Sequence, residues 1–122
     1  MKYTRTYADP AGISHFDDVE IELEQADFAP PAPSLLLSSF SPALQYAFCT
    51  LPAGWYGNWH PAPQRQFSLI LSGELEVQAG DGELRCFGPG SIHLMEDTSG
   101  KGHITRVVGV SDVFAAIIQL PD

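Results

Sequence analysis

Two adjacent carboxylates, Glu96 and Asp97, have a setting in this 122-residue sequence that suits catalysis. They follow an apolar run and precede Thr98-Ser99-Gly100. A carboxylate at the mouth of an apolar cavity has a raised pKa and can abstract a proton beside a carbonyl or assist a lyase step. The same residues suit an Asx-type turn, in which a carboxylate accepts hydrogen bonds from backbone N–H groups. The pair therefore indicates either an acid–base site or a turn, and only one carboxylate need point inward.

A second polar group, Gln64-Arg65-Gln66, enters a run that reads as a strand. Side chains alternate along a strand, so the two glutamines point to one side and Arg65 to the other. If the even positions face the interior, Gln66 offers both a donor and an acceptor to an oxygen-rich ligand. Arg65 then suits an ion pair with Glu96 or Asp97. We therefore predict that Gln64 and Gln66 bind a ligand and that Arg65 has a structural role.

Three aromatic residues, Trp55, Tyr56 and Trp59, lie just before His60. Their rings supply apolar and stacking area of the kind found in small-ligand pockets, so we predict that they bind a sugar or an aromatic ring. The alternative is that they close one end of the protein or pack under a proline-rich arm.

The elements that must position these residues are short β-like runs, because no run from residue 44 onward has an apolar period of 3.6. The runs cover residues 44–51, 66–71, 74–79, 83–87, 91–95, 103–108 and 113–120. Turn signals separate them, and Asp81-Gly82 predicts a type I′ hairpin. Many short strands with such turns predict an all-β sandwich or closed barrel.

Residues 1–34 are polar and interrupted by proline, ending in Ala29-Pro30-Pro31-Ala32-Pro33, which favours extended polyproline-like structure. Within this segment, Val19, Ile21 and Leu23 alternate with glutamates, as in a strand with one exposed face. We therefore expect an N-terminal arm over residues 1–34, with one edge strand, and a barrel over residues 35–122.

The spacing between Gly54 and Gly73 resembles the first motif of the cupin superfamily, in which a glycine is followed by two histidines, a glutamate and a second glycine. His60 takes the first histidine position. Ala62 stands at the second histidine position and Gln66 at the glutamate position. Two of the four ligand positions of the resembled family have therefore changed chemistry.

The second cupin motif resembles the turn and strand over residues 88–95, followed by a longer loop that ends at the final ligand position, His103. The resemblance covers about residues 44–120. The strings over 60–66 and 96–103 are similar to those of a small bacterial cupin subfamily. Membership implies a double-stranded β-helix, a jelly-roll-like conical barrel with its site at the mouth, and a homodimer formed by strand exchange between outer sheets.

Cupins commonly hold Zn, Ni, Mn or Fe with imidazoles and one carboxylate. The resemblance gives this chain two such ligands, His60 and His103, which could instead hydrogen-bond to a ligand or to each other. Gln66 offers only a neutral oxygen, so we expect a divalent metal to be weakly bound or absent unless His93, Gln66, a nearby carboxylate or a substrate completes the site. His93 is the open case, since its parity on the strand also suits an ordinary structural histidine.

Cupins include dioxygenases, isomerases, lyases and sensor domains, so the fold does not decide the function. We expect a small-molecule-binding protein with a degenerate metal site that binds or transforms a polar, carbohydrate- or carboxylate-like metabolite. The alternatives are a metal-dependent enzyme of the dioxygenase, isomerase or lyase type, and a ligand sensor without activity.

Composition excludes several partners. The net charge of −9 repels nucleic acid and anionic membrane surfaces. No apolar run approaches the length of a bilayer span, and the N-terminus lacks the apolar region of a signal peptide. Cys49 and Cys86 form no CxxC pair. We therefore expect a cytoplasmic protein whose partners are a small ligand and a second copy of itself.

Overall fold

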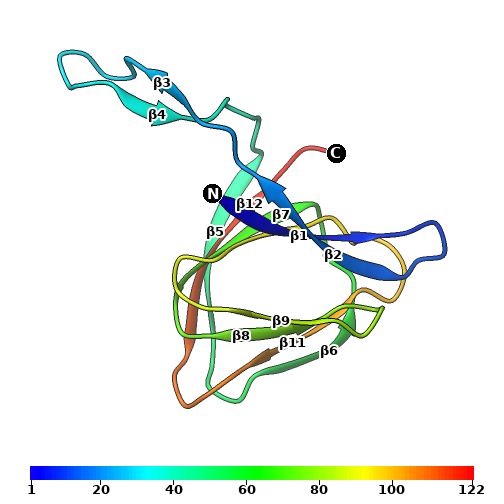
Figure 1. Cartoon of the computed structure of the whole chain (residues 1–122). Helices are drawn as coiled ribbons and strands as arrows, with labels where there is room; N and C mark the ends of the chain where they lie inside the picture. Colours follow the sequence, from blue (N-terminus) through cyan, green and yellow to red (C-terminus); the bar gives the residue numbers. More distant parts are fainter.

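The computed structural model describes all residues from 1 to 122, and it contains two facing β-sheets and a projecting hairpin (Figure 1). One sheet has six strands in the order β2-β1-β10-β7-β12-β5. Its strands are β1 (Lys2–Ala8), β2 (Ser14–Glu20), β5 (Gln45–Leu51), β7 (Gln66–Ser72), β10 (Ile92–Met95) and β12 (Val113–Gln119). The second sheet has the order β6-β11-β8-β9. It contains β6 (Tyr56–His60), β8 (Leu75–Gln78), β9 (Leu84–Phe87) and β11 (His103–Val107).

The all-β prediction is confirmed, and each of the seven predicted runs contains one strand whose ends lie within one residue of those predicted. The core lies between the two sheets. In Figure 1 these sheets face each other across the barrel, below the label of the N-terminus. The core cluster contains Phe16, Ile70, Leu75, Val77, Ala79, Phe87, Val107, Val113 and Ala115. The structure has no helix that is long and apolar enough to cross a membrane.

The N-terminal segment differs from the expected arm, because residues 2–20 belong to the barrel. Strand β1 pairs in parallel with β10 and antiparallel with β2, which forms one edge of the six-stranded sheet. Thr6 of β1 is fully buried and Ser14 of β2 nearly so. Hydroxyl groups thus face the interior here, and for that reason the apolar pattern did not reveal β1. The predicted edge strand at Val19, Ile21 and Leu23 overlaps only the end of β2.

The projecting arm comprises residues 21–44 and carries the two-stranded sheet of β3 (Glu24–Ala26) and β4 (Leu35–Leu37), which stands off the barrel in Figure 1. The proline-rich segment forms the turn between these strands and not an extended polyproline helix, since the Ala32 N–H donates to the Ala29 carbonyl at 2.9 Å. Proline at a fixed φ suits both structures, so the sequence alone did not distinguish them.

The turn at Asp81-Gly82 joins β8 to β9 as a hairpin, as predicted, but it is not of type I′. Type I′ requires positive φ at both central residues. Only Gly82 has one, at 94°, and no residue other than glycine has positive φ in this structure. The backbone bonds between Ala79 and Glu83 enclose a three-residue loop with its glycine in the left-handed region.

Strand β7 determines which residues face the interior. Gln66, Ser68 and Ile70 are buried, whereas Phe67 and Leu69 lie on the outer face. The even positions are therefore interior, which places Gln66 inside the barrel.

Candidate functional site

A cavity of about 170 Å³ lies between the two sheets. Its polar lining comes from His60, Gln66, Ser68, His93, His103 and Thr105, and the apolar part includes Trp55. The two sheets contribute jointly, since Gln66 and His93 lie on the six-stranded sheet and His60 and His103 on the other. The histidines at the two retained ligand positions thus meet in one enclosed space.

His103 is held by a buried carboxylate. Its Nδ1 donates to Oδ2 of Asp97 at 2.5 Å, and the side chains are 3% and 0% exposed. The other carboxylate oxygen, Oδ1, is buried with no hydrogen-bond partner. A carboxylate can only accept, so the hydrogen bond places a proton on Nδ1 of His103; in the neutral form of the ring, Nε2 is then the acceptor.

His60 pairs in register with His103 across β6 and β11, and the ring centroids lie 4.6 Å apart with an angle of 59° between the planes. Its Nδ1 donates to the carbonyl oxygen of Asn58 at 2.6 Å. By the same reasoning, Nε2 is the acceptor in the neutral form of the His60 ring. One wall of the cavity thus presents two imidazoles whose tautomers are fixed by neighbouring oxygens.

Gln66 belongs to a row of three amides across the six-stranded sheet. Gln45 Nε2 donates to Gln119 Oε1 at 2.6 Å, and Gln119 Nε2 donates to Gln66 Oε1 at 3.1 Å. The NH₂ group of Gln66 then has no partner within the chain and is available to the cavity. The sequence identified Gln66 but missed the other two residues, because nothing in its order indicates which glutamines become neighbours across strands.

His93, left open by the sequence, lines the cavity and is buried. Its ring stacks on Phe87 with centroids 4.5 Å apart, and its Nε2 lies 2.6 Å from Oγ1 of Thr6. Burial is the main cause that lowers the pKa of His93, to about 3. A neutral histidine therefore packs between the core and the cavity.

Glu96 lies away from the cavity lining. It accepts from Nε of Arg65 at 2.5 Å and pairs more loosely with Arg5 at 3.4 Å. The predicted ion pair of Arg65 is confirmed, with Glu96 as its partner. Of the two predicted carboxylates, only Asp97 reaches the buried site, so the single inward carboxylate is the second of the pair.

The remaining predicted ligand residues separate in space. Trp55 lines the cavity, whereas Tyr56 is 57% exposed. Trp59 lies under the ammonium group of Lys101, which is 4.7 Å from its ring centroid. Gln64 donates to the Leu120 carbonyl at 3.0 Å. Of these residues, only Trp55 is placed where it can touch a ligand in the cavity.

The donor set can be compared with that of a transition-metal site, which uses at least three protein ligands. No group of three or more His, Cys, Asp or Glu side chains is arranged to hold an ion. Beside His60 and His103, Oε1 of Gln66 and Nε2 of His93 are already engaged by other side chains, and Asp97 is not among the residues that line the cavity. These residues do not fit a resident transition-metal ion.

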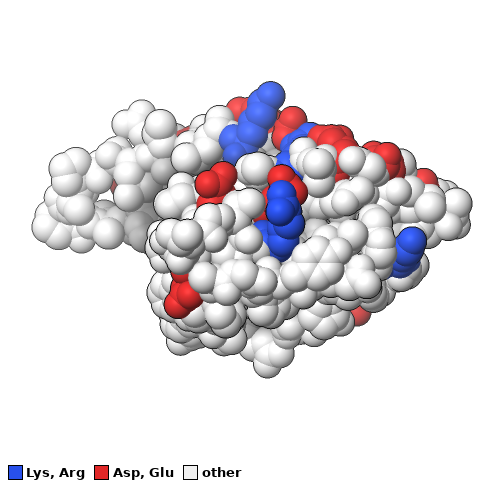
Figure 2. All heavy atoms as spheres, turned by 90° about the horizontal axis from the view of Figure 1, so that it is seen from below, with Lys and Arg blue, Asp and Glu red and all other residues white.

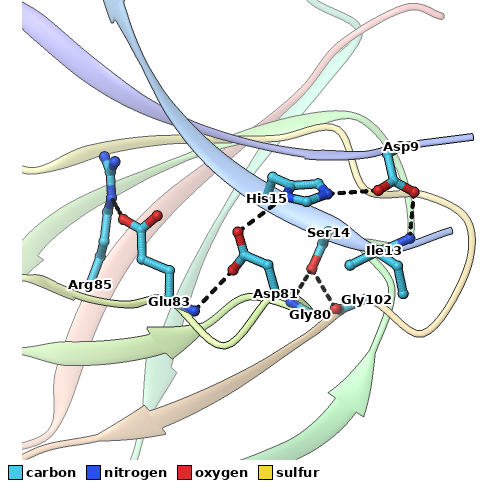
Figure 3. Close-up of polar contacts among 9 residues, drawn as sticks. All are labelled: Asp9, Ile13, Ser14, His15, Gly80, Asp81, Glu83, Arg85 and Gly102. Carbon is cyan, nitrogen blue, oxygen red and sulfur yellow. Dashed lines mark hydrogen bonds and ion pairs between the residues drawn. The ribbon is translucent and has the colours of Figure 1, made fainter. Parts of the chain in front are cut away.

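The loop that carries Asp97 and His103 is anchored at two points. The backbone N–H of buried Ala62, at the altered ligand position, donates to the Asp97 carbonyl at 3.0 Å. The Ser14 hydroxyl donates to the Gly102 carbonyl at 2.8 Å and accepts from the Gly80 N–H at 2.7 Å (Figure 3). The first residue of β2 therefore supports the loop through a buried hydroxyl group.

Beside this anchor, His15 lies between two carboxylates (Figure 3). Its Nε2 is 2.7 Å from Asp9 and its Nδ1 is 3.0 Å from Asp81. These bonds, first that to Asp9, raise the pKa of His15, and His15 lowers the pKa of Asp9. We call Asp9, Ser14, His15 and Asp81 the clasp. The sequence did not predict it, because these residues form no motif and come from two turns and strand β2.

Comparison with known proteins shows no matching family model and no matching curated protein. Solved structures do match. A putative ethanolamine utilization protein Q from Salmonella typhimurium gives a TM-score of 0.49 at 15% identity, over 99% of this chain and 96% of that one. A predicted oxalate decarboxylase from Thermotoga maritima gives 0.48 at 22% identity, over 84% of this chain and 95% of that one.

The cupin domain of Cnp3 from Schizosaccharomyces pombe superposes over 99% of this chain and 88% of its own, with a TM-score of 0.53 at 12% identity. Likeness at this identity speaks for the fold and not for a shared activity. The order of strands in the two sheets, the cavity between them and this superposition lead to one conclusion: the chain has the cupin fold, a double-stranded β-helix.

Proposed function

We propose that the cavity binds a small, uncharged, oxygen-rich metabolite such as a short sugar or hydroxycarbonyl compound. The observation that carries this proposal is the pair of imidazole lone pairs on His60 and His103, accompanied by the NH₂ group of Gln66. Lone pairs accept from hydroxyl groups, and the amide donates to a hydroxyl or carbonyl oxygen.

The size and charge of the cavity favour such a ligand. A volume of about 170 Å³ corresponds to roughly six water molecules in liquid water. No lysine or arginine is among the lining residues, so a carboxylate or phosphate would be buried there without a counter-ion. The ring of Trp55 offers an apolar wall for the carbon skeleton of the ligand.

Paired three-carbon compounds test the proposal. Glyceraldehyde and glycerate have similar size, but only glycerate is charged at neutral pH. Saturation-transfer NMR should detect glyceraldehyde or dihydroxyacetone on the protein, with glycerate at least about 10-fold weaker because its carboxylate is desolvated. Replacing Gln66→Leu should abolish binding, whereas Gln78→Leu, outside the cavity lining, should not. Preferential binding of glycerate, or no binding of either uncharged compound, would overturn the proposal.

Metal content separates this proposal from the metalloenzyme alternative. Protein purified without chelator should contain Zn, Ni, Mn and Fe well below one ion per chain, because the donor set lacks a third ligand. A near-stoichiometric metal that is lost in both His60→Ala and His103→Ala would favour the metalloenzyme instead.

We also propose a homodimer, supported by apolar surface on two parts of the chain. On the outer face of β5 and β12, Tyr46 and Phe48 are 75% and 63% exposed, and Phe48 stacks on Phe114 with centroids 6.1 Å apart. The projecting arm exposes Leu36 and Phe40. Large exposed apolar patches mark interaction sites, and a two-fold pair lets each copy cover both parts of the other.

Sedimentation analysis tests the dimer. The chain should sediment as a dimer at micromolar concentration, and Phe48→Arg should yield a monomer. Gln78→Arg adds the same charge on the other sheet and should remain dimeric. A monomeric parent chain would contradict this proposal without affecting the ligand proposal.

We do not propose nucleic acid as a partner. Each arginine is ion-paired to a carboxylate: Arg5 to Asp17, Arg65 to Glu96, Arg85 to Asp18 and Arg106 to Glu76. On the face drawn in Figure 2, most basic side chains accordingly lie beside acidic ones. No basic patch is available to a phosphate backbone, which such binding requires.

A further inference from the structure

We infer that His103 is a general base that removes a C–H proton beside the carbonyl group of the bound hydroxycarbonyl, with Asp97 as its positioning residue. This inference rests on the proposed function, since it requires that such a ligand enter the cavity. It adds a reaction class, the interconversion of a hydroxyaldehyde and a hydroxyketone.

The geometry of the pair carries the inference. The Nδ1–H of His103 is engaged by Asp97 at 2.5 Å, so the unprotonated Nε2 is the nitrogen left for the cavity. When Nε2 takes a proton, the adjacent buried carboxylate stabilises the imidazolium that forms. Asp97 has no competing partner, because its other oxygen is buried without any hydrogen bond. The whole charge of this carboxylate thus serves one imidazole.

Gln66 supplies the group that such a base requires. Removing a proton beside a carbonyl places negative charge on the carbonyl oxygen. The amide oxygen of Gln66 accepts from Gln119, which orients the NH₂ group away from that contact and leaves it for the cavity. A donor fixed in this way before the reaction can stabilise the enolate oxygen.

His60 completes the transfer. In the forward step, the C–H bond breaks, its electron pair forms the enediolate, and the proton moves to Nε2 of His103. Return of that proton to the neighbouring carbon, while His60 Nε2 carries the hydroxyl proton from one oxygen to the other, converts the aldehyde into the ketone. All atoms and electrons are accounted for without an oxidant, a reductant or a second substrate.

Proton NMR in D₂O tests the inference with glyceraldehyde and dihydroxyacetone as probes. The parent chain should replace the carbon-bound proton beside the carbonyl with deuterium and should interconvert the two compounds. His103→Gln should lose both activities by at least about 100-fold, the usual contribution of a general base. His60→Gln should retain deuterium exchange while losing most of the interconversion. Glu76→Gln, a carboxylate paired with Arg106 outside the cavity lining, should match the parent.

The role of Asp97 has its own readout. In Asp97→Asn, ¹⁵N-detected NMR of the His103 ring should show the proton moved from Nδ1 to Nε2, together with at least a 10-fold loss of exchange. Circular dichroism checks that each variant is folded. If His103→Gln is unfolded, the comparison of Asp97→Asn with the parent chain tests the role of His103 as the base.

The outcomes separate the two proposals. Saturation-transfer NMR on the same samples reports binding. A probe that binds without exchanging faster than in protein-free buffer overturns this inference and leaves the proposed function intact. If neither probe binds, the proposed function fails and this inference fails with it. Exchange that is unaffected in His103→Gln overturns the assignment of the base.

Discussion

Thr6 and His93 lie 2.6 Å apart between Oγ1 and Nε2, and both side chains are inside the barrel. One belongs to the first strand and the other to β10, so the N-terminal strand supplies the partner of a buried imidazole. Because the ring is stacked on Phe87 and shielded from water, it stays neutral where an exposed histidine would be charged.

This buried histidine should make the protein sensitive to mild acid. The pKa of His93 is about 3 in the folded state, and about 6.5 is usual for an unfolded chain. Between these values the unfolded state binds more protons, so stability falls as the pH drops through that window. We expect urea unfolding at pH 7 and pH 5 to show that His93→Gln removes about 2 kcal/mol of the acid-induced loss. If the unfolding free energies of His93→Gln and the parent differ by the same amount at pH 7 and at pH 5, this prediction is wrong.

The contribution of the clasp to stability should change with pH in the opposite direction to that of His93. The pKa of His15 is raised in the folded state, so its stabilisation is complete below the unfolded pKa and is lost as the pH rises through the folded one. The pKa of Asp9 is lowered, so its contribution is lost as the pH falls through that lower value. Because His93 acts in the opposite direction near pH 6, the clasp is measured as a difference: between pH 6 and 8 the Tm of the parent chain should fall relative to that of Asp81→Asn. Glu83→Gln, in the same turn but not bonded to His15, should keep the slope of the parent.

Gly102 should tolerate no side chain. Its φ is 78°, and a Cβ atom there would overlap the carbonyl group of His60. Because this backbone contact cannot yield without displacing β6 from β11, Gly102→Ala should cost about 2–4 kcal/mol in urea unfolding and disrupt ligand binding. Gly82→Ala is the matched control, since φ there is 94° but no atom lies near the added Cβ. It should cost only about 1–2 kcal/mol. Equal losses of unfolding free energy in Gly102→Ala and Gly82→Ala would contradict the proposed overlap with the His60 carbonyl group.

Ser14 should contribute more to the free energy of unfolding than its size suggests. Its hydroxyl bonds both the Gly80 N–H and the Gly102 carbonyl in a buried position, so Ser14→Ala leaves two backbone groups unsatisfied. We expect a loss of about 1–3 kcal/mol in urea unfolding. Ser34→Ala, which removes a hydroxyl bonded to Asp27 on the exposed arm, should change stability little. A loss in Ser14→Ala no larger than that in Ser34→Ala would contradict the anchor.

The sequence predicted the strands that glycine turns separate, and it missed those without an apolar pattern. Strand β7 was identified because the apolar run of Phe67 and residues 69–71 ends at the turn of Ser72-Gly73. Strands β1 and β6 were missed because their interior or neighbouring positions are hydroxyl-bearing or small, as with Thr6 and Gly57. An apolar period in the sequence reveals a buried strand face only where the buried side chains are themselves apolar.

The candidate site was also only partly predictable from the sequence. His60, Gln66 and His103 were found from motif spacing, and the structure brings them to one cavity. The choice between Glu96 and Asp97 was not available from sequence, since it depends on which way a loop turns after β10. The partnership of Gln66 with Gln119 likewise depends on the register between β7 and β12.

The place of β12 in the sheet bears on how the protein is made. This strand lies between β7 and β5, although it is the last strand of the fold to leave the ribosome. Until residue 119 has been synthesised, β5 lacks its neighbour and β7 has an open edge, and such unpaired edges invite association between nascent chains. Barrel closure therefore waits for residues 113–119, and a translational pause before residue 113 would prolong the state in which these edges are unpaired.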